Sequence, residues 1–170
     1  YFSYEQSLMG VAAGLQQALE TCNISGEIVV FDTDAVRLGL DFSDTYKFHR
    51  YTSATTTLVC TSVAKPKNSN FVVFNDNSGE TALIAMETEG LILSSNVIKC
   101  GMMICSTEAT SFIRNHACAI NSWIGLLEHL SLLGNMRTYI TPRPLIYANI
   151  NTPQELIETE ELLKGKINEK

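Results

Sequence analysis

The chain has 170 residues, of which 45% are hydrophobic and 18% charged, and this composition is typical of one globular domain with a substantial core. Its formal net charge of −6 disfavours a nucleic-acid partner, because contacts with a phosphate backbone need clustered Lys and Arg. A small anionic ligand is not excluded, since a few local donors can bind it. No apolar run approaches the roughly 18 residues of a membrane span, and nothing resembles a signal peptide. We therefore expect a single domain over residues 1–170 without a membrane or nucleic-acid partner.

The first part of the chain predicts two helices around a strand. Apolar residues at helical spacing predict a helix over residues 9–20. The run EIVVFDTDAV, residues 27–36, predicts a strand that is buried on both faces, as in a parallel sheet, and that ends on two acids. Residues 41–51 predict a short helix capped by either Asp41 or Ser43.

The middle of the chain is rich in strand patterns and in cysteine. β-Branched residues favour a strand over residues 53–64, two apolar runs around a polar turn predict a hairpin over residues 71–87, and a further strand is expected at 97–105. The five cysteines of the chain form no CxxC pair and leave one over, which favours buried reduced thiols in a cytoplasmic protein: Cys22, Cys60, Cys100, Cys105 and Cys118.

The last part predicts one helix or a pair over residues 107–133, two short strands at 136–140 and 142–150, and a final amphipathic helix. Thr152 as N-cap, Pro153 at the first helical position and Glu155 at the third form a capping box for that helix. The order of elements is α-β-α-β-β-β-β-α-β-β-α. It predicts a three-layer α/β fold whose mixed sheet is mostly parallel and carries an inserted antiparallel hairpin.

Two carboxylates follow the first predicted strand. Asp32 and Asp34 lie two positions apart at its carboxyl end. Mg²⁺ takes oxygen ligands, often one or two protein carboxylates together with substrate phosphates. Acids at this end of a strand would place the metal in the crevice where open α/β sheets bind nucleotides. The same spacing is equally typical of two solvated loop acids.

Asn149 ends the apolar run LIYAN just before the capping box. Its side-chain oxygen could be a further metal ligand at the carboxyl end of a strand, or the amide could simply hold the turn. When Asn149 is considered alone, a role in holding the turn is favoured. When it is considered together with the acids at the other strand end, the case for a metal ligand becomes stronger. No Ser-His-Asp group and no nucleophile elbow is present.

These segments, in this order, resemble the nucleotidyltransferases with the GT-A-like α/β fold, a superfamily that includes sugar-nucleotide pyrophosphorylases and molybdenum cofactor guanylyltransferases. MGVAAGLQQALE is similar to a helix that family members begin with G-x-x-A-G-L, and IVVFDTDAV is similar to a strand that ends in N-G-D or C-D. FVVFNDNSGETALIAMET resembles the hairpin that precedes an E-K-P motif. NINTPQEL closely resembles the N-I-N-T-P-E-D-L of the guanylyltransferases and is the most specific of these motifs.

The resemblance implies a role for several residues. Asp34 takes the place of the catalytic Asp that binds Mg²⁺, and Asn149 takes the place of the second metal-binding acid. The residues that it implies are Asp34, Asn149 and Asp32 for Mg²⁺; Gly10, Ala13 and Gly14 for the nucleotide; and Glu87, Lys99 and Gly101 for the acceptor.

The chain departs from the family pattern at three points. The G-x-G-T-R loop that holds the triphosphate is not among the 170 residues, so the resemblance covers the core and the C-terminal part of the fold. METE stands in place of the E-K-P motif, with Glu87 as its nearest acid, and Lys99 stands where the family has Asn. Nucleotidyl transfer depends on neutralising charge around the phosphates, so we expect inefficient catalysis from these residues alone.

The resemblance implies an Mg²⁺-dependent nucleotidyltransferase in which a sugar 1-phosphate, or a comparable phosphomonoester, attacks the α-phosphorus of a nucleoside triphosphate and releases pyrophosphate. The expected partners are that nucleotide and a small phosphorylated acceptor, and a homo- or hetero-oligomer is left open. The alternative is a degenerate, non-catalytic member that acts as a regulatory or assembly subunit. A third reading is an α/β domain whose acids are incidental.

Overall fold

The computed structural model describes residues 3, 10–64, 71–75, 81–86, 95–120, 122–143 and 145–167. The helices of this part are α1 (Val11–Thr21), α2 (Phe42–Thr52), α3 (Thr107–His116), the short 3-10 helix η1 (Ala117–Ala119), α4 (Trp123–Leu132) and α5 (Pro153–Ile167). The strands are β1 (Ile28–Phe31), β2 (Ala35–Leu38), β3 (Thr56–Ser62), β4 (Phe71–Asn75), β5 (Thr81–Met86), β6 (Val97–Cys105), β7 (Met136–Ile140) and β8 (Ile146–Asn149).

Capping side chains fix the helix starts that the sequence predicted. Of the two candidate caps for α2, Asp41 is the one used, because its Oδ1 accepts the backbone N–H of Asp44 at 3.1 Å. The capping box of α5 is confirmed in both directions. The N–H of Thr152 donates to Oε2 of Glu155 at 2.9 Å, and the N–H of Glu155 donates to Oγ1 of Thr152 at 3.2 Å.

Six strands form the main sheet, and β6 lies inside it. β6 pairs antiparallel with β3 on one side and with β1 and β4 on the other, β7 pairs parallel with β3, and β5 pairs antiparallel with β4. Strands β1, β3, β4 and β7 therefore run in one direction, whereas β5 and β6 run in the other. The mixed sheet and its antiparallel hairpin confirm the predicted α/β fold class. Among the described pairings of this sheet only β3 with β7 is parallel, so the expectation of a mostly parallel sheet is wrong.

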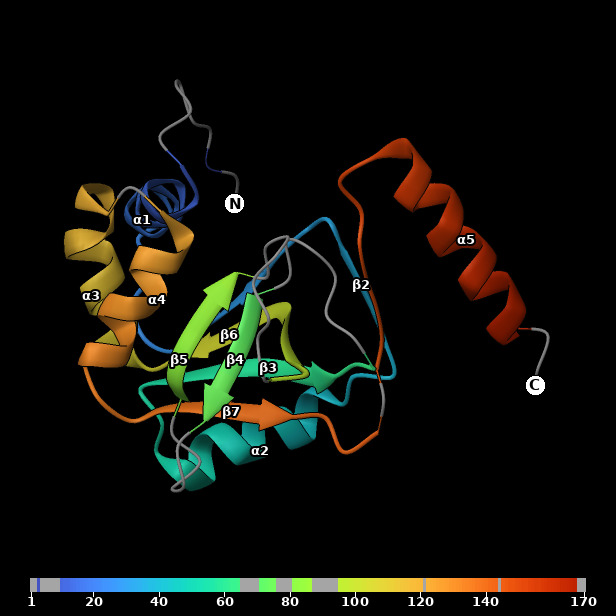
Figure 1. Cartoon of the computed structure of the whole chain (residues 1–170). Helices are drawn as coiled ribbons and strands as arrows, with labels where there is room; N and C mark the ends of the chain where they lie inside the picture. Colours follow the sequence, from blue (N-terminus) through green and yellow to red (C-terminus); the bar gives the residue numbers. More distant parts are fainter. Residues whose placement is uncertain are drawn as a thin grey trace.

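Helices cover both faces of the main sheet and make the three predicted layers (Figure 1). α1, α3 and α4 pack on one face over a core that contains Leu58 and Met103, and α2 lies on the other face, where Val59 and Ile104 are buried. Neighbouring residues of a strand point to opposite faces, so a strand between two helical layers is apolar at consecutive positions. This explains why β3 and β6 are buried at almost every position.

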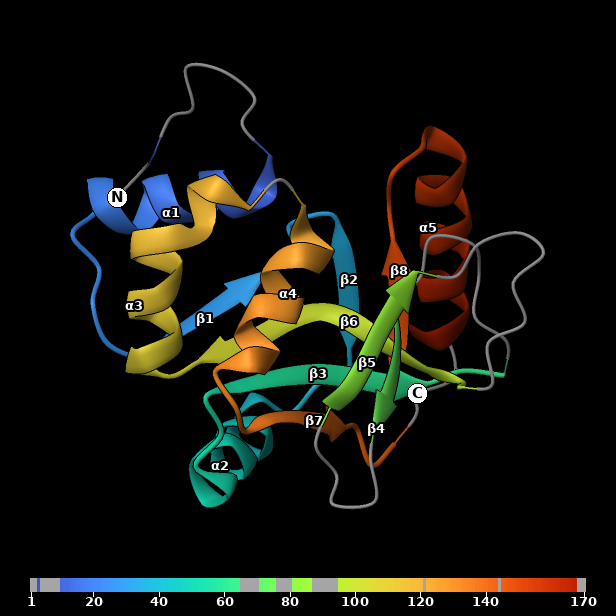
Figure 2. The ribbon, with the colours of Figure 1, turned by 60° about the vertical axis from the view of Figure 1, so that its left-hand side comes forward.

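A separate ribbon of two antiparallel strands, β2 and β8, stands beside the main sheet (Figure 2). Its register pairs Ala35 with Asn149 and Arg37 with Tyr147. The sequence predicted one strand over residues 27–36, but the chain turns after β1 at Thr33 and Asp34, and β2 leaves the main sheet. Asn149 therefore ends a strand, as expected, but that strand belongs to the ribbon.

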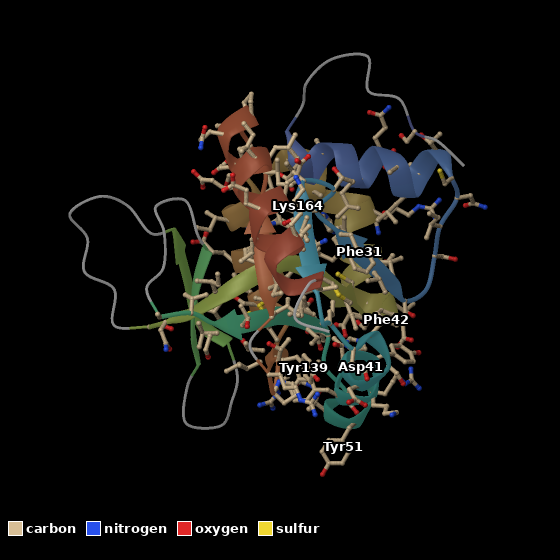
Figure 3. All side chains as sticks on the ribbon, turned by 90° about the vertical axis from the view of Figure 1, so that its right-hand side faces the viewer. Phe31, Asp41, Phe42, Tyr51, Tyr139 and Lys164 are labelled. Carbon is tan, nitrogen blue, oxygen red and sulfur yellow. The ribbon has the colours of Figure 1, made fainter. Side chains whose placement is uncertain are left out.

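α5 follows the ribbon and stands away from the main sheet (Figure 1). It packs chiefly on β8 and leaves three apolar side chains more than two fifths exposed: Leu156, Ile157 and Leu162. Figure 3 views the molecule from the side on which Phe31 and Phe42 are also exposed. Within the described part of the chain, no helix combines the length and apolar character that crossing a membrane would need.

Candidate functional site

An ion pair joins the end of β1 to the middle of β6. The Nζ of Lys99 lies 3.0 Å from Oδ2 of Asp32, and the Lys99 side chain is 1% exposed whereas the Asp32 side chain is 34% exposed. The Lys99 ammonium also lies over the ring of Trp123 at 5.1 Å from its centroid, a cation–π contact with the start of α4. The pair therefore presents a carboxylate to solvent and keeps its cation inside.

Gly101 allows β1 and β6 to approach closely at this point. Its φ of +62° is a conformation that residues with a side chain rarely adopt. A Cβ on Gly101 would lie 2.8 Å from Oδ2 of Asp32 and 2.5 Å from Nη2 of Arg37. The backbone N–H of Asp32 donates to the Gly101 carbonyl at 2.8 Å. Asp32 and Arg37 therefore occupy the space that a side chain on residue 101 would need.

Arg37 ties the ribbon to the main sheet through backbone carbonyl groups. Its Nε donates to the carbonyl of Cys100 at 2.5 Å and its Nη1 to that of Ala35 at 2.9 Å. Its Nη2 donates to the carbonyls of Asp32 at 2.7 Å and Gly101 at 2.5 Å. The planar guanidinium thus holds β2, β6 and the residue after β1 in one fixed arrangement.

The ribbon brings Asn149 to the same region. The N–H of Ile150 donates to the carbonyl of Asp34 at 2.7 Å, next to the register pair of Ala35 and Asn149. Side chains two positions apart on a strand share a face, so Asn149 lies on the face of β8 that carries Tyr147, the register partner of Arg37. The Oδ1 atom of Asn149 is buried and accepts no hydrogen bond from the residues that the structure describes. A buried acceptor without a partner is costly and marks a position where a ligand can supply the missing donor or cation.

Burial and charge at this site act on two further side chains. Burial raises the pKa of the Cys100 thiol to about 12, although Arg37 and Lys99 oppose the rise. Burial also raises the pKa of Tyr147 far above its ordinary value of 10.0, assisted by Cys100, Asp32 and Asp34. Both groups therefore stay protonated and neutral around neutral pH, and the Tyr147 hydroxyl remains a hydrogen-bond donor.

The predicted Mg²⁺ ligands do not all fit a metal ion. The unpartnered Oδ1 of Asn149 and the exposed carboxylate of Asp34 are oxygens of the type that Mg²⁺ prefers. Asp32 does not fit, because the ammonium of Lys99 already neutralises its carboxylate. The described residues contain no cluster of three or more His, Cys, Asp or Glu that could hold a metal ion. Mg²⁺ binding stays a prediction, with Asp34 and Asn149 as the remaining candidate ligands.

The structure brings together some of the predicted site residues and not others. Asp32, Lys99 and Gly101 are in direct contact, and the ribbon carries Asp34 and Asn149. Gly10, Ala13 and Gly14 lie at the start of α1, and within the described residues no hydrogen bond or ion pair links them to Asp32 or Lys99. Glu87 lies outside the described residues.

Sequence reasoning missed three residues of this site. Arg37 had a signal, because it is the charged residue of the otherwise apolar strand AVRL. Trp123 is the single Trp of the chain, and its spacing gave no hint that it would cover Lys99. Tyr147 lies in the run LIYAN, whose pattern indicates a strand and does not indicate a site residue.

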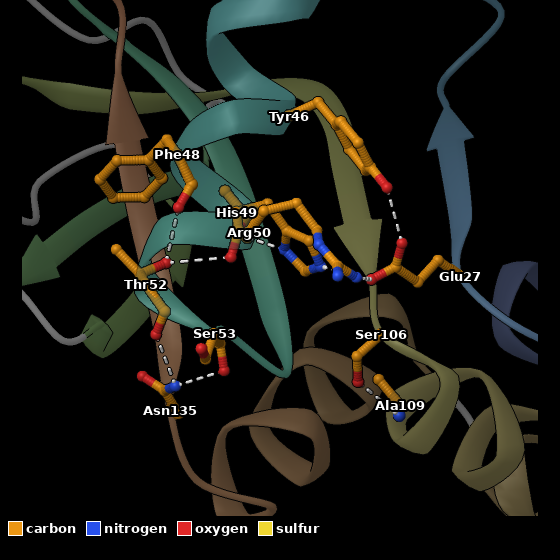
Figure 4. A network of polar contacts seen from close by, with 11 residues as sticks. Glu27, Tyr46, Phe48, His49, Arg50, Thr52, Ser53, Ser106, Ala109 and Asn135 are labelled. Carbon is orange, nitrogen blue, oxygen red and sulfur yellow. Dashed lines mark hydrogen bonds and ion pairs between the residues drawn. The ribbon is translucent and has the colours of Figure 1, made fainter.

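A second polar network lies on α2 and is structural (Figure 4). Glu27 accepts hydrogen bonds from Tyr46 at 2.9 Å and Arg50 at 2.7 Å. Nδ1 of the buried His49 lies 2.8 Å from Oγ1 of Thr57, and its Nε2 lies 3.9 Å from Glu27. Because His49 and Thr57 are 2% and 0% exposed, a substrate does not reach them.

Comparison with known proteins identifies the fold. No family model and no curated protein sequence matches the chain. A protein described as a glucose-1-phosphate thymidylyltransferase, from Bacillus anthracis in complex with sucrose, matches with a TM-score of 0.72 at 14% identity, over 92% of this chain and 62% of that one. HddC from Yersinia pseudotuberculosis matches with a TM-score of 0.67 at 13% identity, over 93% of this chain and 64% of that one.

These matches establish a nucleotidyltransferase-like fold for the chain. The chain spans less than two thirds of the length of either structure, so it corresponds to a part of their fold. At identities of 14% and 13%, the matches show a similar arrangement of the backbone and do not identify a substrate or a set of catalytic residues.

Proposed function

We propose that the protein is a nucleotidyltransferase that joins a nucleoside monophosphate unit to a sugar 1-phosphate or a similar phosphomonoester. A phosphate oxygen of the acceptor attacks the α-phosphorus of a nucleoside triphosphate. The bond from that phosphorus to the oxygen bridging to the β-phosphate breaks, and pyrophosphate leaves. The observation that carries this proposal is the buried Oδ1 of Asn149, unpartnered among the described residues, which lies on a nucleotidyltransferase-like fold beside the turn that follows β1.

Each group at the site has a proposed role. Asn149 and Asp34 orient the ligand and are the side chains that would hold Mg²⁺. The ion would supply positive charge beside the phosphates. Lys99 and Gly101 shape the acceptor side together with Glu87, and the turn from Gly10 to Gly14 at the start of α1 lies toward the nucleotide base.

The activity is proposed for the whole protein and not for these 170 residues alone. The triphosphate carries much of the charge that the transition state must share, and the G-x-G-T-R loop expected to hold it is not among the 170 residues. The chain also spans only 62% and 64% of the two structures that it matches. The described residues contribute the acceptor side and the Asn149 side of the site.

A second candidate is a non-catalytic nucleotidyltransferase-like subunit that binds a nucleotide or nucleotide sugar and regulates or assembles with other chains. The Asp32–Lys99 ion pair favours it, because a neutralised carboxylate contributes little to phosphoryl chemistry. Pyrophosphate release by the whole protein separates the two candidates. Release from a nucleoside triphosphate and a sugar 1-phosphate supports the transferase, whereas saturable ligand binding by the whole protein without release supports the subunit.

Thermal unfolding with ligands tests the shared part of both candidates. The protein is melted with ATP, GTP, CTP, UTP and their glucose diphosphate derivatives, each with and without Mg²⁺. A ligand that binds the native state raises the melting temperature by mass action. We expect a rise with at least one ligand that is lost in Asn149→Ala and Asp34→Ala. Glu161→Ala, which removes an exposed carboxylate from α5, should keep it. No rise with any ligand would exclude both candidates for this chain.

A further inference from the structure

We propose that the Lys99 ammonium is the fixed cation of this site and takes the place of a divalent cation at Asp32. The carboxylate of Asp32 then serves as the counter-ion of Lys99 and not as a metal ligand. The inference rests on the proposed function only in treating this site as one that binds a phosphorylated ligand. Whether Asp32 binds a metal ion is a separate question that can be tested by itself.

The Lys99 ammonium already balances the charge of the Asp32 carboxylate. An ion coordinated by Asp32 would stand beside the ammonium that lies 3.0 Å from its Oδ2. The two cations would repel each other, and because the Lys99 side chain is 1% exposed, solvent screens this repulsion less than it would in bulk water.

The ammonium cannot leave to make room for a metal. The Lys99 side chain is 1% exposed and its Nζ lies 5.1 Å from the centre of the Trp123 ring. A buried ammonium without its carboxylate would remain uncompensated, which is strongly unfavourable. Lys99 is therefore a permanent part of the site and not a surface lysine that happens to lie nearby.

The backbone of Asp32 is also held in place. Its N–H donates to the Gly101 carbonyl at 2.8 Å, and its own carbonyl accepts from Nη2 of Arg37 at 2.7 Å. A Cβ on Gly101 would lie 2.8 Å from Oδ2 of Asp32. Gly101 and Arg37 thus fix the backbone of Asp32, while Lys99 holds its carboxylate through Oδ2.

A titration with Mn²⁺ alone, in the absence of nucleotide, tests the proposal. Paramagnetic broadening of backbone amide signals near residue 32 reports binding in the full 170-residue chain. The single variant Asp32→Asn, in which Lys99 is kept, should leave the Mn²⁺ affinity of the protein unchanged. Lys99→Met should raise the affinity at least 10-fold, and the double variant Asp32→Asn with Lys99→Met should lose that gain. Lys47→Gln, which removes an exposed lysine of α2, is the charge control and should change nothing.

Two results would overturn the proposal. One is tight Mn²⁺ binding by the native sequence that Asp32→Asn weakens 10-fold or more, and the other is no gain in Lys99→Met. If Lys99→Met fails to fold, the double variant decides in its place. A fixed buried pair predicts that the double variant regains the fold, and its failure to fold would contradict the proposal. Because no nucleotide is present, this outcome is independent of whether the proposed function holds.

Discussion

The guanidinium of Arg37 lies where a side chain on residue 101 would have to be. A Cβ built on Gly101 would stand 2.5 Å from Nη2 of Arg37, and the same Nη2 donates to the Gly101 carbonyl. Arg37 thus holds the ribbon that carries Asn149 on the main sheet, at Cys100 and Gly101. The shape of the candidate site depends on this contact, and two predictions follow directly from it.

Gly101→Ala should reduce the free energy of unfolding by at least about 2 kcal/mol, because it combines a strained positive φ with a collision against Arg37 and Asp32. Urea denaturation measures the loss. Gly39→Ala is the matched control, since Gly39 has a φ of +94° but open space around its Cβ. It should cost about 1 kcal/mol from strain alone. Equal losses in the two variants would show that the close packing at Gly101 is unimportant.

Arg37→Lys should destabilise the protein by about 2 kcal/mol or more, although it keeps the charge. A lysine cannot reproduce the fork that serves the carbonyls of Cys100, Asp32 and Gly101 at once, so buried acceptors lose their partners. Hydrogen exchange should also speed up in β2 and β8. Arg114→Lys, at an arginine whose described hydrogen bonds are 3.2 and 3.5 Å long, should change stability by less than about 1 kcal/mol.

Thiol labelling should distinguish the cysteines by burial. Cys118 is exposed and Cys22 is half-buried, whereas Cys60, Cys100 and Cys105 are buried. Burial raises the pKa of Cys100 and of Cys105 to about 12, which suppresses the reactive thiolate. With an aromatic disulfide reagent at pH 8, we expect one fast thiol, one slower thiol and three that react only on unfolding. Cys118→Ser should remove the fast phase, and three rapid thiols in the native protein would refute the burial described.

Stability should fall as the pH drops below about 6.5, and His49 should cause part of the fall. Burial lowers the pKa of His49 below its ordinary value of 6.5, against the attraction of Glu27 and with the help of Arg50. The unfolded chain therefore binds a proton before the folded chain does, and protonation favours unfolding between pH 6.5 and the lower folded pKa. Urea denaturation at pH 7 and pH 5.5 measures this, and His49→Gln should flatten the difference. An unchanged slope in His49→Gln would contradict the assignment.

The carboxyl of Glu27 acts in a lower pH range. Its hydrogen bonds with Arg50 and then Tyr46 lower the pKa of the Glu27 carboxyl from its ordinary value of 4.5. A carboxyl with a lowered folded pKa adds stability above pH 4.5 that disappears as the pH falls through the folded pKa. The contribution is small because the group is near the surface. Glu27→Gln should therefore alter the stability profile below pH 4.5. It should also enlarge the loss of stability below pH 6.5, because without the attraction of Glu27 the pKa of His49 falls further.

Local physics made the helices and most strands predictable from the sequence. The capping box of Thr152 and Glu155 forms as expected, because it depends on residues three apart. The ribbon was not predictable, because β2 and β8 are four residues each and their pairing joins Asp34 to Ile150 across the chain. Helix and strand patterns carry no information about which short strands will meet.

The strand ends at the candidate site were predictable from the sequence, and the charges around them were not. Asp32 and Asn149 stand at strand ends, which the apolar runs revealed. The ion pair of Asp32 with Lys99 joins residues 67 positions apart, and it depends on β1 lying beside β6. In the sequence, Lys99 is recognisable only as a lysine at a position where the nucleotidyltransferase pattern has Asn. Its burial against Trp123 turns it into the internal cation of the site.

The central claim is that a nucleotide-type ligand binds beside the end of β1 and the Asn149 side of the ribbon. The most direct measurement is a titration of the ¹⁵N-labelled protein with nucleotide sugars, followed by backbone and Asn side-chain amide shifts. We expect saturable shifts at residues 32–37, 99–101 and 147–150, including the side-chain amide of Asn149, with no shift at His49 and Thr57. An absence of shifts with every nucleotide sugar, or shifts confined to the α2 network, would contradict the central claim.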